Sequence, residues 1–115
     1  MIRVMIVEDS PVVAALLTQI LGTAPGIQVV ATAATGERAI KLLPVVNPDV
    51  ITMDVRLPGM DGFEATRHIM ETRPVPIIIV TGSFEQSDVE ASFRAMAAGA
   101  VAILEKLKLY SHRRS

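Results

Sequence analysis

Short apolar runs alternate with stretches of helical periodicity along the whole chain. Five runs rich in valine and isoleucine have the length of buried strands, at Ile2–Val7, Ile27–Ala33, Val50–Met53, Ile77–Val80 and Val101–Leu104. Between them, apolar residues recur every three or four positions, which predicts amphipathic helices at 11–21, 36–43, 63–71 and 87–98. Strands and helices in alternation favour right-handed crossovers. The pattern therefore predicts an α/β fold in which helices cover both faces of one parallel sheet.

Capping residues predict where several helices begin and end. Ser10 followed by Pro11 has the pattern of an N-cap and a first helical residue. Pro44 is expected to end the second helix after Leu43, because proline cannot donate a helical hydrogen bond. The pattern over 106–115 is weak, so we expect a last helix that is short or frayed. The fourth helix is expected to turn one apolar stripe toward the core, formed by Val89, Phe93, Met96 and Ala97.

The length and composition narrow the class of protein. A chain of 115 residues is the size of one domain, so we expect residues 1–115 to form a single unit. The absence of cysteine excludes disulfides, thiolate metal sites and a thiol nucleophile. A net charge of −1 gives no reason to expect direct binding to nucleic acid or to a membrane surface. No signal-peptide pattern or membrane-length apolar stretch is present, so we expect a cytoplasmic protein.

Polar residues directly follow four of the five predicted strands. Glu8 and Asp9 follow the first strand, and Asp54 follows the third. Thr81 follows the fourth, and Lys106 lies just beyond the fifth. Because the carboxyl ends of parallel strands meet at one rim of a sheet, we expect these side chains to lie close together. Open α/β sheets place their binding sites at this rim.

Three carboxylates at one place require a counter-charge, because they would otherwise repel one another. Oxygen ligands without histidine or cysteine favour Mg²⁺ over zinc or copper. Lys106 is suited to a phosphoryl oxygen, Thr81 to a further hydrogen bond, and Asp54 to covalent acceptance of the phosphoryl group. Each residue alone also has an ordinary structural interpretation, with Asp9 as a helix cap, Asp54 as a strand end, Thr81 as a turn residue and Lys106 as a solvated lysine.

These segments resemble the receiver domain of two-component response regulators, and the resemblance covers essentially the whole chain. The D-x-x-L-P-x-M-D-G run from Asp54 to Gly62 is a highly specific signature of that family. The stretch Arg73–Val80 is most similar to the receivers of chemotaxis methylesterases. The other matching segments are Val7–Ser10, Asp49–Met53, Val80–Gly82, and Gly99-Ala100 followed by Lys106.

The resemblance implies a flavodoxin-like, doubly wound, five-stranded sheet of strand order 2-1-3-4-5. It implies that Asp54 takes a phosphoryl group from a sensor histidine kinase or a phosphotransfer protein in a two-component phosphorelay. Thr81 and Lys106 would contact that phosphoryl group and draw the neighbouring loops inward, which is the conformational signal.

The resemblance also implies a complete metal site. Asp9 and Asp54 would bind Mg²⁺ directly, Glu8 would act through water, and the backbone carbonyl of Arg56 would be a further ligand. The Arg56 side chain lies two residues after the phosphoacceptor, where it either shields the phosphoryl group from water or is simply an exposed loop residue.

The sequence departs from the family pattern near its end. Ile103 takes the place of a common aromatic residue, and Leu107 follows the lysine in place of proline, so we expect a trans peptide bond there. These departures leave open a degenerate receiver that binds partners without phosphorylation. An Mg²⁺-dependent aspartyl phosphohydrolase is a further alternative, although Arg56 occupies the position where such an enzyme needs an acid–base aspartate. With no G-x-S-x-G motif in the chain, we expect a signalling phosphoacceptor and not an enzyme, apart from self-catalysed phosphotransfer and slow autodephosphorylation.

Overall fold

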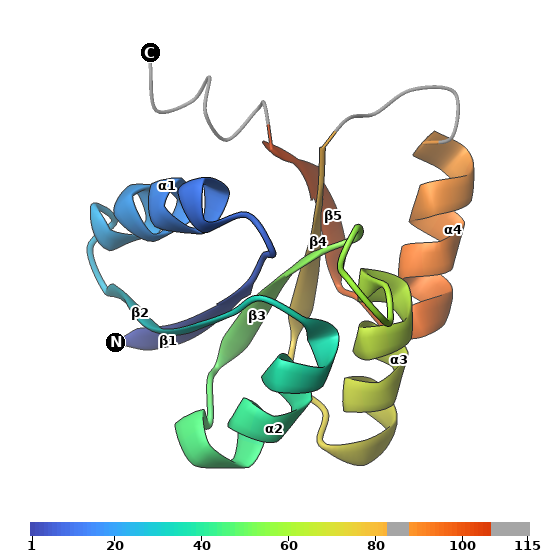
Figure 1. Cartoon of the computed structure of the whole chain (residues 1–115), viewed down its shortest axis with the longest axis horizontal. Helices are drawn as coiled ribbons and strands as arrows, with labels where there is room; N and C mark the ends of the chain where they lie inside the picture. Colours follow the sequence, from blue (N-terminus) through green and yellow to red (C-terminus); the bar gives the residue numbers. More distant parts are fainter. Residues whose placement is uncertain (83–87, 107–115) are drawn as a thin grey trace.

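The computed structural model describes residues 1–82 and 88–106, which form one parallel sheet flanked by helices (Figure 1). The strands are β1 (Ile2–Val7), β2 (Ile27–Ala33), β3 (Val50–Asp54), β4 (Ile77–Thr81) and β5 (Ala102–Glu105). The helices are α1 (Pro11–Gly22), α2 (Gly36–Val46), α3 (Gly62–Thr72) and α4 (Asp88–Ala98). The strand order β2-β1-β3-β4-β5 confirms the predicted flavodoxin-like, doubly wound α/β fold.

The two faces of the sheet pack against different helices. Met5, Ile51 and Ile79 belong to the larger core cluster, which includes buried residues of α2, α3 and α4. Val4 and Ile6, which alternate with these positions, pack with Leu17 of α1 on the other face. Figure 1 shows this layering, with α1 on one side of the sheet and the other three helices on the opposite side. Burial on both faces explains why the central strands β1, β3 and β4 are almost entirely apolar.

The strand register aligns the carboxyl ends of the central strands. Val7 pairs with Met53, and Asp54 pairs with Val80. Thr81 pairs with Glu105 at the end of β5. The residues that follow β1, β3, β4 and β5 therefore share one rim of the sheet. Among the described residues, no helix has the length and apolarity needed to cross a bilayer.

The predicted end of the second helix was wrong. The helix α2 continues through Pro44 to Val46 and stops at Asn47, whose φ of 53° is left-handed. Pro44 lies in the last turn, so its missing N–H removes one bond near the end of the helix and does not interrupt a long run. The Asn47 N–H donates to the Leu43 carbonyl at 2.9 Å and closes the helix.

The predicted inward stripe of the fourth helix was also wrong. Phe93 and Met96 are 69% and 73% exposed, whereas Ala95 and Ala98 are buried. The alanines form an alternative stripe on the same helix, and their small side chains permit closer packing of α4 than Phe93 or Met96 would. Of the predicted final helix at 106–115, residues 107–115 lie outside the described residues, as does residue 87, where the fourth helix was predicted to begin.

Candidate functional site

The three predicted acidic residues gather at the shared rim. Glu8 and Asp9 follow β1, and Asp54 ends β3. Each offers a carboxylate oxygen, and these oxygens lie within 4.8 Å of one another. Glu8 and Asp54 are only 4% and 6% exposed, whereas Asp9 is exposed. All of these ligand atoms are hard oxygens at a spacing that one divalent cation can bridge, so the cluster fits Mg²⁺.

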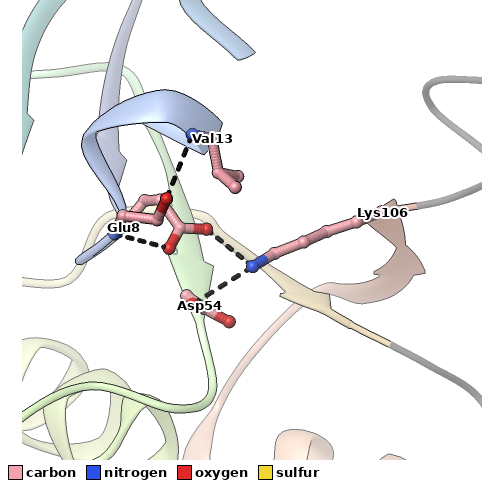
Figure 2. A network of polar contacts seen from close by, with 5 residues as sticks. Glu8, Val13, Asp54 and Lys106 are labelled. Atoms are coloured by element: carbon pink, nitrogen blue, oxygen red, sulfur yellow. Dashed lines mark hydrogen bonds and ion pairs between the residues drawn. The ribbon is translucent and has the colours of Figure 1, made fainter. Parts of the chain in front are cut away.

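Lys106 connects the end of β5 to this cluster. Its Nζ lies 2.6 Å from Glu8 Oε1 and 3.2 Å from Asp54 Oδ2 (Figure 2). Burial lowers the pKa of Lys106, but the contact with Glu8 and the negative charges of Asp54 and Glu8 outweigh it, so the pKa is raised above 10.5. Among the described residues, Glu8 Oε1 has no other polar partner. Lys106 therefore balances much of the negative charge of the site.

The start of α1 holds Glu8 in place. The Ser10 N–H donates to Glu8 Oε2 at 3.1 Å, and Ser10 Oγ accepts from the Val13 N–H at 3.3 Å (Figure 2). Ser10 is thus the N-cap that the sequence predicted, with Pro11 as the first helical residue. In addition, it orients a buried carboxylate of the cluster, which the sequence reasoning did not anticipate.

The start of α3 fixes the backbone of the phosphoacceptor candidate. A Cβ built on Gly62 would overlap the Asp54 carbonyl oxygen, so only glycine fits at this position. The Gly62 N–H donates to the Val55 carbonyl at 2.8 Å. Asp61 caps the helix through Oδ1, which accepts from the Glu64 N–H at 2.9 Å. The Asp-Gly pair before a helix was visible in the sequence as part of the family signature, but the role of Gly62 in placing Asp54 was missed.

A cavity of about 670 Å³ opens over the cluster. Thr81 and Arg56 both line it, Thr81 half-buried and Arg56 exposed. Three further lining residues, Phe63, Glu90 and Arg94, were not predicted. They come from α3 and α4, and no local sequence signal showed that these helices would meet at the cavity.

Of the two residues at which the sequence departs from the family pattern, only one lies among the residues that the structure describes. Ile103 is half-buried and packs against the larger core cluster. Leu107 lies outside the described residues.

Comparison with known proteins decides the family. A family model described as the response regulator receiver domain matches residues 4–108. The chain belongs to the response regulator receiver family. The receiver is 58% identical over 106 residues to the protein-glutamate methylesterase/protein-glutamine glutaminase 1 of Syntrophus aciditrophicus. The matched region covers 92% of this chain and 30% of that protein. It is 49% identical over 110 residues to a second such enzyme, from Methanospirillum hungatei, with 96% and 31% covered.

Solved structures agree with this assignment. The response regulator domain of Thermotoga maritima CheB superposes with a TM-score of 0.83 at 34% identity, covering 90% of this chain and 77% of that one. The BeF3-activated receiver domain of Klebsiella pneumoniae RstA gives a TM-score of 0.80 at 27% identity, covering 97% and 95%. The predicted similarity to methylesterase receivers is therefore confirmed, and the receiver is of the chemotaxis-like two-component class.

One expectation is overturned by these relatives. We expected a signalling phosphoacceptor and not an enzyme, but the relatives are named as methylesterases and glutaminases, which are enzymes. The receiver spans about 30% of the length of the curated relatives it matches. An activity located in the other 70% of such a protein leaves no trace in these 115 residues.

Proposed function

We propose that this receiver accepts a phosphoryl group on Asp54 from the phosphohistidine of a sensor histidine kinase or a phosphotransfer protein. The observation that supports the proposal most strongly is the position of Lys106. Lys106 lies 3.2 Å from the Asp54 carboxylate, which is 6% exposed, and both residues line the cavity. The lysine is therefore close to where a transferred phosphoryl oxygen would need a positive charge.

The transfer exchanges a phosphorus–nitrogen bond for a phosphorus–oxygen bond. An oxygen of the Asp54 carboxylate attacks phosphorus, the phosphorus–nitrogen bond to the donor imidazole breaks, and the imidazole leaves with that electron pair. The product is an aspartyl phosphate, a mixed anhydride. Lys106 then has a phosphoryl oxygen as a partner in addition to Glu8, and Thr81 donates a hydrogen bond from the cavity wall. Mutual orientation and charge stabilisation contribute most of the rate in such transfers.

We propose Mg²⁺ as the cofactor of this step. Asp9 and Asp54 would hold it directly, with Glu8 acting through water and the Arg56 carbonyl as a further ligand. When bound, it supplies positive charge to the phosphoryl oxygens. The spacing of the three carboxylates supports this assignment, as does the lack of any nitrogen or sulfur ligand in the cluster.

We further propose that residues 1–115 act as one receiver domain that controls a methylesterase or glutaminase activity in the same protein. The relatives' names and the 30% of their length that the receiver matches support this arrangement. Its test is ester hydrolysis by the full-length protein with and without a phosphodonor. Equal rates in wild type and Asp54→Asn under both conditions would contradict the proposed control.

The alternative functions gain no support from the site. A phosphohydrolase would need an acid–base carboxylate two residues after the nucleophile, where the exposed cation Arg56 lies. A degenerate receiver would be expected to lack part of the phosphoryl site, but Asp54, Lys106 and Thr81 all lie at the cavity.

Incubation with Mg²⁺ and acetyl phosphate tests the main proposal. We expect mass spectrometry to show one added phosphoryl group that is lost on alkaline treatment and absent in Asp54→Asn. Glu71→Gln is the matched control, because it removes one exposed carboxylate from the far end of α3. An unmodified wild type, or equal labelling of Asp54→Asn, would refute the proposal. Sustained multiple turnover of a phosphate ester would favour the hydrolase instead.

A further inference from the structure

One arginine joins α4 to the beginning of α3 at the mouth of the phosphoacceptor cavity. The guanidinium carbon of Arg94 lies 4.4 Å from the centroid of the Phe63 ring. Its Nη2 lies 3.5 Å from Asp61 Oδ2, while the other oxygen of Asp61 caps α3. The next residue after Asp61 is Gly62, which touches the backbone of Asp54. Arg94 therefore links α4 to the segment that positions the phosphoacceptor.

The pair between Arg94 and Asp61 is weak in its present form. The two side chains are 54% and 43% exposed, and their separation is at the long limit for a hydrogen bond. Exposed pairs of this kind contribute little, because water screens both charges. A phosphoryl group carries more negative charge than a carboxylate and has three acceptor oxygens, so it is a stronger partner for an arginine. Asp54 and Arg94 line the same cavity, so a phosphoryl group on Asp54 would enter the space that Arg94 borders.

We propose that phosphorylation of Asp54 transfers Arg94 from Asp61 to the phosphoryl group, where it acts as a second cation beside Lys106. The inference rests on the proposed function of Asp54. In this scheme Arg94 contacts the phosphoryl group directly, and its change of partner moves the helix α4 that carries it.

The construction of α4 supports such a movement. Among the side chains of α4 that the structure describes, the buried ones are the small Ala95 and Ala98, which interlock less with their surroundings than large residues would. The same helix carries Phe93 and Met96 on its exposed surface. A shift of α4 therefore reorients an apolar surface that faces solvent in the described structure. This shift of α4 would carry the signal from the site to the protein surface, and it would not need an aromatic residue at position 103, where this chain has Ile103.

Binding of beryllofluoride in the presence of Mg²⁺ tests this transfer, because beryllofluoride mimics a phosphoryl group on the acceptor carboxylate. By fluorine NMR titration, we expect Arg94→Gln to bind it about threefold to tenfold more weakly than wild type. We expect Asp61→Asn to bind it about twofold to fivefold more tightly, because it frees Arg94 while asparagine still caps α3. The tighter binding caused by Asp61→Asn should be absent when Arg94→Gln is present in the same protein. Arg67→Gln removes the same charge from the exposed surface of α3 and is the control.

The two single variants are expected to change beryllofluoride affinity in opposite directions. This difference distinguishes a change of partner by Arg94 from a role in which the Arg94–Asp61 pair only stabilises the site. If Arg94→Gln binds like wild type, or if both single variants weaken binding, Arg94 does not change partner and the inference fails while the proposed function stands. If wild type binds no more beryllofluoride than Asp54→Asn does, both fail together. As an independent readout, hydrogen exchange in α4 should change on beryllofluoride binding in wild type, and this change should be reduced in Arg94→Gln. An undiminished change in the variant would also overturn the inference.

Discussion

Replacing Gly62 by alanine is expected to displace the phosphoacceptor itself. The added Cβ would overlap the Asp54 carbonyl oxygen and would lie 2.8 Å from the Asp54 carbonyl carbon and 3.0 Å from Val55 Cα. All three are backbone atoms, so no side-chain rotation can relieve the overlap. The Asp54–Val55 backbone or the start of α3 would have to move by about 1 Å or more, because packed interiors hold no free space for the extra atom.

The substitution Gly62→Ala is expected to lower both the free energy of unfolding and the rate of phosphorylation. Overpacking typically costs about 1–3 kcal/mol, and weakening the bond from the Gly62 N–H to the Val55 carbonyl adds about 0.5–1.5 kcal/mol. The better helix propensity of alanine offsets this loss in the free energy of unfolding by up to about 1 kcal/mol. We therefore expect a net loss of about 0.5–4.5 kcal/mol in the free energy of unfolding. Misplacing a reacting carboxylate by about 1 Å can also cost on the order of a hundredfold in rate.

Urea denaturation and the rate of labelling by acetyl phosphate measure these two effects separately. Gly22→Ala is the matched control, because a Cβ built on Gly22 meets nothing within 4 Å. We expect that control to label at the wild-type rate and to be at least as stable as wild type. Wild-type stability together with wild-type labelling in Gly62→Ala would refute the reasoning.

Three further predictions concern the charges around the cluster. Without Mg²⁺, Lys106→Met leaves the buried carboxylates of Glu8 and Asp54 without their cation, so urea denaturation should show a loss of about 3–5 kcal/mol that Mg²⁺ largely restores. An unchanged stability in EDTA would contradict this. Because the pKa of Lys106 is raised above 10.5 in the folded state, its contribution to stability should be fully present below pH 10.5 and disappear as the pH rises through the folded-state pKa. The difference in unfolding free energy between wild type and Lys106→Met should therefore be constant at neutral pH and shrink under alkaline conditions, and a difference that grows there would show the opposite sign. Finally, Mg²⁺ at a hundred times its dissociation constant should stabilise the wild type by about 2.7 kcal/mol, as followed by thermal unfolding. Asp9→Asn should lose most of this stabilisation by Mg²⁺, but in EDTA it should be as stable as the wild type.

The rim of the sheet was the most predictable feature of this chain. Once the apolar runs were assigned to parallel strands, the positions of Glu8, Asp9, Asp54 and Lys106 followed from where the strands end. This works because the path of a parallel strand is determined by burial on both faces, which the sequence displays directly. Residue chemistry suggested the roles of Asp54, Thr81 and Lys106 in phosphoryl transfer, the family resemblance added the individual metal ligands, and all of these roles remain predictions.

Helix faces and contacts between helices were less predictable. Two apolar stripes compete on α4, and the choice of Ala95 over Phe93 depends on how closely the helix can approach its neighbours. The position of Arg94 over Phe63 depends on the relative placement of two helices whose contact residues lie some 30 positions apart in the chain. Hydrophobic periodicity describes one helix at a time, so it contains no information about such pairings.

The central position of β1 has a consequence for how the chain reaches this structure. The strand β1, which comes before the other four along the sequence, lies inside the sheet between β2 and β3 (Figure 1). Val4 pairs with Val50, so about 45 further residues must be synthesised after Val4 before that partner exists. Until then, one edge of an almost wholly apolar strand has no neighbour, and every pairing must close a long crossover. We therefore expect folding on the slower side for a protein of this size, with the β1–α1–β2 segment as the piece most in need of protection from aggregation on the ribosome.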